Sequence, residues 1–423
     1  MQTLNCPAVL VSAPASGQGK TLTSAALARA WRNQGLKVQA FKCGPDFIDS
    51  MILQAASGNP VYNLDLGMCG LEDGKAKLYA AAQHADVILV EGVMGLYDGT
   101  PSSADLAEAF GLTVLLTIEA SGMAQTFAAI AQGLLHYRLQ LKTAGVIANQ
   151  VGSAGHAQML KDCLPSDIPW FGHLVKDTQF SLPERHLGLY LADEIHDLDA
   201  RIAAAALALC NGAELPLPPT VSFAAPANEP TPPLLAGKTI AIARDAAFCF
   251  IYPANIDCLK DLGAKLVYFS PLADATLPEA DAYWLPGGYP ELHLDKLSQN
   301  DTMRRCLQQA HAADKPILAE CGGMMALGET LNGAAGFGLL AGNSEIQPRL
   351  QGLGTQYVST PHGKLAAHTF HYGEFNTSLV PATKAESQWG QGEAVYRVEN
   401  ITASFLHFYF PSNLQASAEL FLP

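Results

Sequence analysis

Short apolar runs alternate with helical patterns along this chain, and the alternation limits the folds open to it. "AVLVSA" (8–13) predicts a strand, and the next residues predict a helix over 20–35 that Gly35 stops. Further strands are predicted over 37–42, 86–92, 112–118 and 143–150. Continuous Val, Ile and Leu runs separated by helices predict an α/β fold with a parallel sheet covered on both faces.

The alternation stops once and then restarts. Residues 212–237 are rich in Pro and Ala and keep no period, which predicts a linker. We therefore expect one domain over 1–211 and a second over 238–423, and a chain of 423 residues is long enough for both. The second domain is predicted to be strand-rich from about residue 354, after strands over 239–244, 265–270, 282–288 and 316–320.

The composition excludes several classes of function. A net charge of −14 argues against nucleic-acid and membrane-surface partners, because both require a basic face. No apolar run reaches the roughly 18 residues of a membrane span, and the chain does not open with a signal-peptide pattern, so a cytoplasmic protein is expected. The nine cysteines are scattered and form no CxxC, which favours reduced thiols over disulfides or a zinc site.

The segment "SAPASGQGKT" joins the first predicted strand to the first predicted helix and has the features of a phosphate-binding loop. Gly17 and Gly19 let the backbone curl so that its N–H groups point inward, and the helix N-terminus adds partial positive charge. Lys20 can reach the phosphates of a nucleotide, and the Thr21 hydroxyl can bind Mg²⁺. Pro14 stands where the strict motif has its first glycine, and a plain glycine-rich turn is the alternative.

Two acidic residues follow later apolar strands. Asp46 lies in "FKCGPDFID", and Glu91 lies in "DVILVEGVMGLYDG". The carboxyl ends of parallel strands share one edge of a sheet, so both acids should lie beside the phosphate loop, where oxygen ligands suit Mg²⁺. With Thr21 they form the predicted metal site, although each acid alone could cap a helix or lie in solvent. Asn149 ends another predicted strand and could hydrogen-bond an adenine or cap a turn.

One of the nine cysteines stands where a strand turns into a helix. In "KPILAECGGMMALGE" the strand ends at Glu320 and delivers Cys321 to a sharp turn, which Gly322 and Gly323 permit. This arrangement is typical of a nucleophile elbow. The helix N-terminus is expected to lower the thiol pKa, and the Gly322 backbone N–H is expected to stabilise an oxyanion. A buried packing thiol is the alternative.

A nucleophilic cysteine needs a base, and His407 in "TASFLHFYF" is the candidate. Its strand-like run isolates one imidazole among aromatic side chains, and a histidine that only packs is the alternative. The segment "LPGGYPE" is another strand that ends in two glycines, Gly287 and Gly288. We expect Gly288 to supply a second backbone donor to the oxyanion.

Several motifs together resemble those of a known enzyme family. "SAPASGQGKT", "FKCGPDFID", "EGVMGLYDG" and "PERHLGL" (183–189) are similar to the synthetase domain of the cobyrinate a,c-diamide synthases. "ARDAAFCFIYPAN" (243–255), "LPGGYPELH", "AECGGMMALGE" and "SFLHFYFPSN" are similar to the glutaminase domain of the same family. The motifs occur in the family's order and cover nearly the whole chain.

The resemblance implies a dethiobiotin-synthetase-like P-loop domain followed by a class I glutaminase domain. It implies a ligase that uses ATP, Mg²⁺ and glutamine to amidate the a and c acetates of cobyrinic or hydrogenobyrinic acid, a corrinoid polycarboxylate, through acyl phosphates. A homodimer is one expected assembly. The implied site residues are Cys321 and His407 for glutamine hydrolysis, Gly288 and Gly322 for the oxyanion, Gly17, Gly19, Lys20, Thr21 and Asn149 for the nucleotide, and Thr21, Asp46 and Glu91 for the metal.

The sequence departs from the class I glutaminase pattern at two positions. Ala319 replaces the first glycine of G-x-C-x-G, and Tyr409 replaces the Glu of H-x-E, so no third triad member is predicted. "HTFHYGEF" (368–375) resembles the family's G-H-E-F-H segment with Ala367 and Thr369 substituted, and no role is assigned to it. The alternatives are a nickel-sirohydrochlorin a,c-diamide synthase, another tetrapyrrole amidotransferase such as cobyric acid synthase, and a P-loop switch protein with an inactive glutaminase fold.

Overall fold

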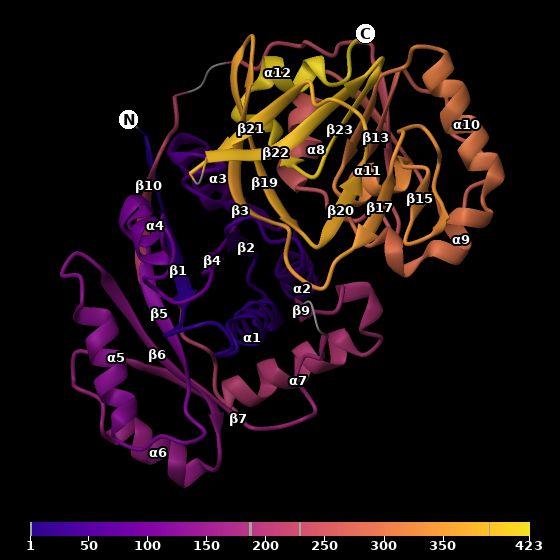
Figure 1. The fold of residues 1–423 in the computed structure, drawn as a ribbon. Coiled ribbons are helices and arrows are strands. Elements are labelled where there is room, and N and C mark those ends of the chain that lie inside the picture. Colours follow the sequence, from indigo (N-terminus) through magenta and orange to yellow (C-terminus); the bar gives the residue numbers. More distant parts are fainter. Residues whose placement is uncertain (1, 186–187, 228–229, 389) are drawn as a thin grey trace. The chain divides into compact units, whose positions relative to one another are not determined.

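The computed structural model divides the chain into two compact units, Met1–Asn228 and Glu229–Pro423, which are coloured indigo to magenta and orange to yellow in Figure 1. The structure describes residues 2–185, 188–227, 230–388 and 390–423. The motif "PERHLGL" includes His186 and Leu187, which lie outside these ranges.

The first unit is built on a parallel sheet. β1 lies at its centre and pairs in parallel with both β4 and β5. The strands follow the order β3-β2-β4-β1-β5-β6-β7, and each neighbouring pair in this order is parallel, so the predicted parallel sheet is confirmed. Their bounds are β3 (Tyr62–Leu64), β2 (Val38–Cys43), β4 (Val87–Glu91), β1 (Thr3–Ser12), β5 (Thr113–Glu119), β6 (Lys142–Val151) and β7 (Trp170–Val175).

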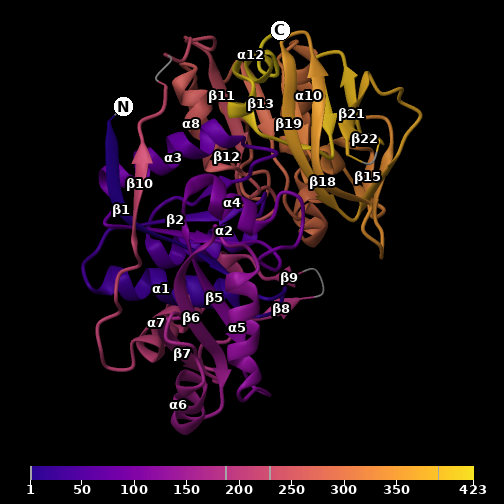
Figure 2. The same ribbon diagram turned by 90° about the vertical axis from the view of Figure 1, so that its left-hand side faces the viewer.

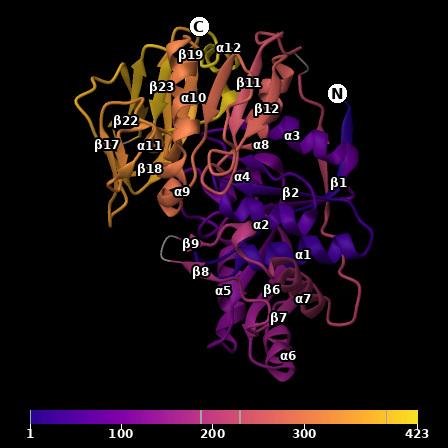
Figure 3. The ribbon, with the colours of Figure 1, turned by 90° about the vertical axis from the view of Figure 1, so that its right-hand side faces the viewer.

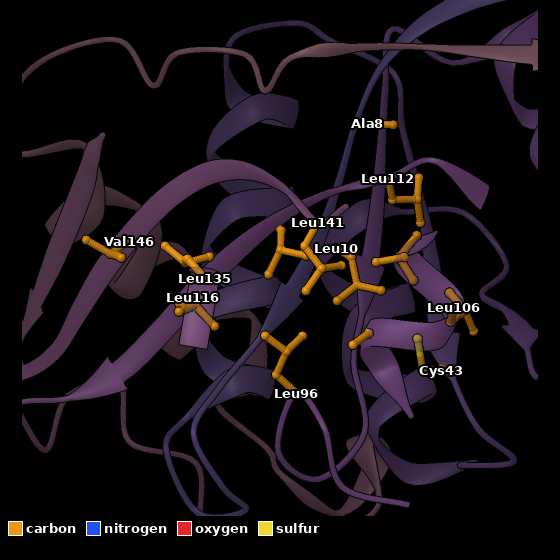
Figure 4. Packing of buried hydrophobic residues seen from close by; sticks show 14 of the residues in the cluster. Ala8, Leu10, Cys43, Leu96, Leu106, Leu112, Leu116, Leu135, Leu141 and Val146 are labelled. Atoms are coloured by element: carbon orange, nitrogen blue, oxygen red, sulfur yellow. The ribbon is translucent and has the colours of Figure 1, made fainter. Parts of the chain in front are cut away.

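Helices cover both faces of this sheet, because successive side chains of a strand point to opposite sides. Val9 and Val11 pack against α1, α2 and α7 on one face. Leu10 packs on the other face, against α3, α4, α5 and α6, and Figure 4 shows it in this cluster with Leu96 and Leu112. The helices are α1 (Lys20–Asn33), α2 (Ile48–Ser57), α3 (Leu71–His84), α4 (Ser103–Phe110), α5 (Thr126–His136), α6 (Ala154–Asp162) and α7 (Leu198–Cys210).

Part of the expected linker over 212–237 belongs to the first unit. β10 (Thr220–Ala224) pairs antiparallel with the beginning of β1, from Thr3 to Pro7, and Figure 2 shows the two strands side by side. Val221 and Phe223 of β10 are buried, whereas the residues between and beside them are exposed. The remaining small elements of this unit are β8 (Glu184–Arg185), β9 (Gly188–Leu189) and the 3₁₀ helix η1 (Ala192–Glu194).

The second unit also begins with parallel strands, in the order β12-β11-β13-β14-β23. α10 and α11 pack on one face of them, and α8 and α12 on the other. Figure 3 shows α10 lying along its face of the sheet. The elements are β11 (Thr239–Ala243), α8 (Pro253–Asp261), β12 (Lys265–Phe269), β13 (Ala282–Leu285), α10 (Asp301–Ala312), β14 (Ile317–Glu320), α11 (Gly322–Leu327), β23 (Ile401–Ser404) and α12 (Leu414–Glu419).

The same sheet continues with antiparallel strands that curl back on themselves. β24 follows β23 after only Phe405 and Leu406, yet four strands separate the two in the order β23-β22-β21-β18-β19-β24. β19 therefore returns to lie beside β24. The bounds are β18 (Gly352–Thr360), β19 (Gly363–His371), β21 (Thr383–Ser387), β22 (Gly390–Val398) and β24 (His407–Phe408).

A small second sheet and three short helices complete this unit. The sheet has the order β16-β15-β17-β20. Among the helices in the described part of the chain, none combines the length and the apolar character needed to cross a membrane. The bounds are β15 (Thr330–Leu331), β16 (Ala334–Ala335), β17 (Asn343–Ile346), β20 (Gly373–Asn376), α9 (Leu294–Gln299), η2 (Pro290–Leu292) and η3 (Phe410–Ser412).

The packing of β1 predicts a large effect of one core substitution. Leu10→Ala should lower the free energy of unfolding by about 2–5 kcal/mol, because Leu10 is fully buried and its loss leaves a cavity. Leu139 is 89% exposed, so Leu139→Ala is the matched control, with an expected change within about 0.5 kcal/mol. Urea unfolding followed by circular dichroism measures both, and equal effects would contradict this description of the core.

Candidate functional site

The loop between β1 and α1 requires glycine at two positions. Gly17 and Gly19 have φ angles of +77° and +83°, in the left-handed region. A Cβ atom on Gly19 would lie 2.1 Å from Nδ2 of Asn149. That amide nitrogen donates a hydrogen bond to the carbonyl oxygen of Gln18 at 2.9 Å. The structure therefore brings Asn149 to the loop as a cap on its backbone, and contact with an adenine stays a prediction.

Lys20 begins α1 and is buried against the loop. Its Nζ donates to the carbonyl oxygen of Ala15 at 3.2 Å. Burial, followed by the nearby positive charge of Lys42, lowers the pKa of Lys20. A neutral carbonyl group does not balance a buried ammonium, so this side chain would gain from an anion bound at the loop.

Glu91 connects the loop to the neighbouring strands. It ends β4 opposite Val11 of β1 and opposite Lys42 of β2. Its Oε1 accepts hydrogen bonds from the Thr21 hydroxyl at 2.9 Å and from Lys42 Nζ at 2.8 Å. Its Oε2 is buried and has no hydrogen-bond partner among the described residues. A buried carboxylate oxygen of this kind, beside a hydroxyl, fits a Mg²⁺ ligand.

Two members of this cluster, Lys42 and Asp49, were not predicted from the sequence. Lys42 is almost fully buried, and its Nζ also donates to Asp49 Oδ2 at 2.7 Å. Although burial acts to lower it, the charges of Asp49 and Glu91 hold the pKa of Lys42 well above its usual value. A lysine at the end of an apolar strand was the available signal, because a buried ammonium must find carboxylates.

Asp46 lies two residues before α2 begins. Its Oδ1 accepts a hydrogen bond from the backbone N–H of Asp49 at 3.0 Å, and its carbonyl oxygen accepts one from the Ser50 hydroxyl. Burial and then the neighbouring Asp49 raise the pKa of Asp46 to about 7. Over the described ranges, no three His, Cys, Asp or Glu side chains form a ready set of metal ligands. Metal binding by Asp46 therefore stays a prediction.

In the second unit, Cys321 has the backbone of an elbow. Its φ and ψ are +46° and −109°, an unusual conformation for a residue other than glycine, and α11 begins at the next residue. Its backbone N–H donates to the carbonyl oxygen of Ser404 on β23 at 2.7 Å. A Cβ on Gly323 would lie 2.0 Å from the carbonyl oxygen of Leu285, so only glycine allows β13 and α11 to approach this closely.

Gly287 lies between the predicted nucleophile and the predicted base. A Cβ on Gly287 would lie 2.3 Å from Cε1 of His407 and 3.3 Å from Cβ of Cys321. The structure therefore brings Cys321 and His407 together from β14 and β24. Both side chains are buried, with exposed fractions of 6% and 3%.

The two glycines expected to stabilise an oxyanion are also neighbours. A Cβ on Gly322 would lie 3.1 Å from the backbone nitrogen and 2.9 Å from the carbonyl oxygen of Gly288. Gly288 itself has φ +157°, and a Cβ there would lie 2.1 Å from the carbonyl oxygen of Ala247. Close backbone approach thus explains both glycines, and their action on an oxyanion stays a prediction.

The protonation states differ from the expected thiolate. Burial raises the pKa of the Cys321 thiol well above its usual value, and a hydrogen bond from the Gly322 N–H opposes this only in part. The prediction that the helix N-terminus lowers this pKa is wrong, because α11 spans only six residues and desolvation dominates. Burial and the charges of His368 and His371 lower the pKa of His407 to about 3. Burial therefore favours the neutral thiol and the neutral imidazole.

The segment "HTFHYGEF" lies next to this pair. His368 of β19 is opposite His407 of β24 in the antiparallel register. The ring of His371 stacks on Phe405 at 3.8 Å, and its Nε2 lies 2.9 Å from Oε1 of Glu393. No role was predicted for this segment from the sequence. Its position opposite β24 follows from the return of β19, which no local pattern shows.

Tyr409 stands where the class I glutaminase pattern has a glutamate. It is fully buried, and its ring packs edge-on against Tyr252, with the ring centroids 5.9 Å apart. A buried carboxyl group nevertheless lies close to the site. It belongs to Glu320, the residue before Cys321, and burial raises its pKa to about 8.

Comparison with known proteins identifies both units. Residues 9–189 match the CobQ/CobB/MinD/ParA nucleotide binding domain, and residues 239–414 match the CobB/CobQ-like glutamine amidotransferase domain. The chain is 53% identical to the hydrogenobyrinate a,c-diamide synthase of Stutzerimonas stutzeri over 100% of both chains. The chain belongs to the hydrogenobyrinate and cobyrinate a,c-diamide synthases.

Two further relatives support this membership, and the family predicted from the motifs is confirmed. The hydrogenobyrinate a,c-diamide synthase of Pseudomonas aeruginosa is 51% identical, over 100% of this chain and 99% of that one. The cobyrinate a,c-diamide synthase of Herminiimonas arsenicoxydans is 48% identical, over 98% of this chain and 96% of that one. The predicted order of a P-loop domain before a glutaminase domain is confirmed as well.

The contacts of Gly287 predict a specific defect. Gly287→Ala should push the His407 ring away from Cys321, and a displacement of about 1 Å can lower a rate about 10²-fold. Glutamine hydrolysis by the purified protein measures the effect. Gly133→Ala in α5 is the control, because a Cβ there meets nothing within 4 Å. Normal hydrolysis by Gly287→Ala would contradict the packing described here.

The burial of Cys321 predicts its titration. Because burial raises the thiol pKa, alkylation of Cys321 by iodoacetamide should reach half its maximal rate above the free-cysteine value of about pH 8.5. The thiolate is the reactive form, so the midpoint of the pH profile reports the pKa independently of how slowly the reagent enters. Peptide mass spectrometry across pH 7–10 follows the rate, which should still be rising at pH 10, and a plateau with a midpoint below that of a free cysteine would refute the prediction.

Proposed function

We propose that this chain amidates the a and c acetates of hydrogenobyrinic acid, with ATP as the energy source and glutamine as the nitrogen source. Two relatives more than half identical to this chain are named for hydrogenobyrinate, which supports the metal-free macrocycle as the substrate. One observation carries the proposal. A chain of this family contains both a buried cysteine–histidine pair and a phosphate loop whose Thr21 hydroxyl donates a hydrogen bond to the buried Glu91.

The first unit would activate the carboxylate. A carboxylate oxygen attacks the γ-phosphorus of ATP, ADP leaves, and the product is an acyl phosphate whose carbonyl carbon is open to attack. Lys20 and the backbone N–H groups of the loop would bind the phosphates. Burial raises the pKa of Glu91, and the positive charge of Lys42 opposes that shift. Bound Mg²⁺, which Thr21 and Glu91 would hold, neutralises charge on the phosphates.

The second unit would release ammonia from glutamine. The Cys321 sulfur attacks the side-chain amide carbon while His407 takes the thiol proton, and the proton is then given to the departing ammonia. Water hydrolyses the thioester and leaves glutamate. The backbone N–H groups of Gly288 and Gly322 would stabilise the oxyanion in both steps.

The two reactions complement each other chemically. Free ammonia is mostly ammonium at neutral pH and is then not a nucleophile, so production from glutamine supplies the reactive form. Ammonia attacks the acyl phosphate, and inorganic phosphate leaves as the amide forms. A cytoplasmic location and a homodimer stay predictions from the sequence.

Two substitutions should separate the two reactions. Cys321→Ser should abolish glutamine-dependent amidation and spare the reaction driven by added ammonia, because the sulfur acts only in ammonia release. Glu91→Gln should abolish amidation with either nitrogen source, because the amide cannot replace the carboxylate towards both Lys42 and a metal ion. Amide formation on metal-free and cobalt-containing substrates, followed by mass spectrometry, measures all of these rates.

The control for the cysteine variant is Cys306→Ser in α10, at a partly exposed thiol outside the pair. It should behave as the wild type with both nitrogen sources. Full glutamine-dependent turnover by Cys321→Ser would refute the proposed nucleophile, and ammonia-driven turnover by Glu91→Gln would place the phosphoryl transfer elsewhere.

A further inference from the structure

The carboxyl group of Glu320 is buried beside the cysteine–histidine pair and takes no part in the chemistry proposed above. Glu320 is the last residue of β14, directly before Cys321, and only 1% of it is exposed. Both of its oxygens accept hydrogen bonds. Oε2 accepts from the indole Nε1 of Trp284 at 2.9 Å, and Oε1 accepts from the backbone N–H of Phe408 at 2.8 Å.

The two donors belong to the other two segments that build the pair's surroundings. Trp284 lies on β13, which continues directly into Gly287 and Gly288. Phe408 is the residue after His407 on β24. The carboxyl group on β14 therefore bonds to two other strands, β13 and β24, and so links the segments that carry the nucleophile, the base and the glycines that flank them.

Such a tie matters because one of these segments is short and another has an unusual backbone. β24 contains only two residues, which pair with β19, and further bonds run from the Tyr409 N–H to Ala366 and from Asn255 to the Phe408 carbonyl oxygen. The left-handed backbone of Cys321 is strained, and strained residues persist only where their surroundings hold them firmly. Loss of this buried acceptor would also leave the Trp284 and Phe408 N–H groups without the bonds that Glu320 provides.

We propose that Glu320 is a positioning residue of the glutamine-hydrolysing site, which fixes Cys321, His407 and the Gly287–Gly288 turn relative to one another through Trp284 and Phe408. This inference rests on the proposed roles of Cys321 and His407. It assigns Glu320 no contact with glutamine, so its loss should lower kcat and leave KM for glutamine nearly unchanged.

Glu320→Gln is the sharpest test, because it keeps the size and shape of the side chain. An ionised carboxyl group accepts through both oxygens, but an amide accepts through one oxygen and presents an NH₂ donor in place of the other. One of the two N–H partners would then face another donor. A shift of about 1 Å at the reacting atoms lowers a rate about 10²-fold, and that is the expected fall in kcat for glutamine hydrolysis.

Trp284→Phe provides a second, independent variant. It removes the bond to Oε2 and leaves the carboxyl group and the Phe408 bond in place. If the indole acts through Glu320, Trp284→Phe should lower kcat in the wild type and have little further effect in Glu320→Gln. Asn400→Ala is the matched stability control, because Asn400 bonds to His311 and Lys315 at the opposite end of β14. It should lower the melting temperature and spare kcat.

Each outcome decides the proposal. A fall in kcat with unchanged KM and unchanged ammonia-driven amidation supports it. Wild-type kcat in Glu320→Gln, or equal loss of glutamine-driven and ammonia-driven rates, would overturn it. If Glu320→Gln does not fold, Trp284→Phe decides alone, and a folded variant with wild-type kcat would refute the role. Glutamine hydrolysis by Cys321→Ser would instead show that the proposed function has failed.

Discussion

Burying a carboxyl group is costly unless hydrogen-bond donors surround it, and each unit buries one at the carboxyl end of a parallel strand. Glu91 ends β4, and its donors are the Thr21 hydroxyl and the Lys42 ammonium. Glu320 ends β14, and its donors come from β13 and β24. Parallel pairing brings neighbouring strand ends to one edge, so these donors also fix the loops that leave that edge.

The two carboxyl groups differ in how many of their oxygens are occupied. Both donors of Glu91 bond to Oε1, and the buried Oε2 has no partner within the described part of the chain. Both oxygens of Glu320 are occupied by donors of the protein. The first group is therefore able to take a ligand such as a metal ion, whereas the second can only hold its own strands. The same solution to burial would serve the proposed ligand binding in one unit and the proposed positioning in the other.

The sequence predicts whatever depends on local pattern. The apolar run before Glu91 indicates a buried strand, and the glycines after Cys321 indicate an elbow, because both signals lie within a few residues. β10 was missed, since Val221 and Phe223 alternate with exposed residues and only the pairing with β1 makes them a strand. The position of His368 opposite His407 was missed for a related reason. β19 reaches β24 only because the sheet between them curls back, and no local pattern encodes that path.

A neutral thiol beside a neutral imidazole restricts when the proposed hydrolysis can start. Moving the proton from Cys321 to His407 creates two charges in a buried site, and burial opposes each of them. A base with a pKa of about 3 cannot hold the proton unless a negative charge forms beside it. Attack on glutamine moves that charge from sulfur to the oxyanion, where the N–H groups of Gly288 and Gly322 would receive it. Burial therefore favours proton transfer and attack in one step, with the thiol proton leaving only when glutamine is bound.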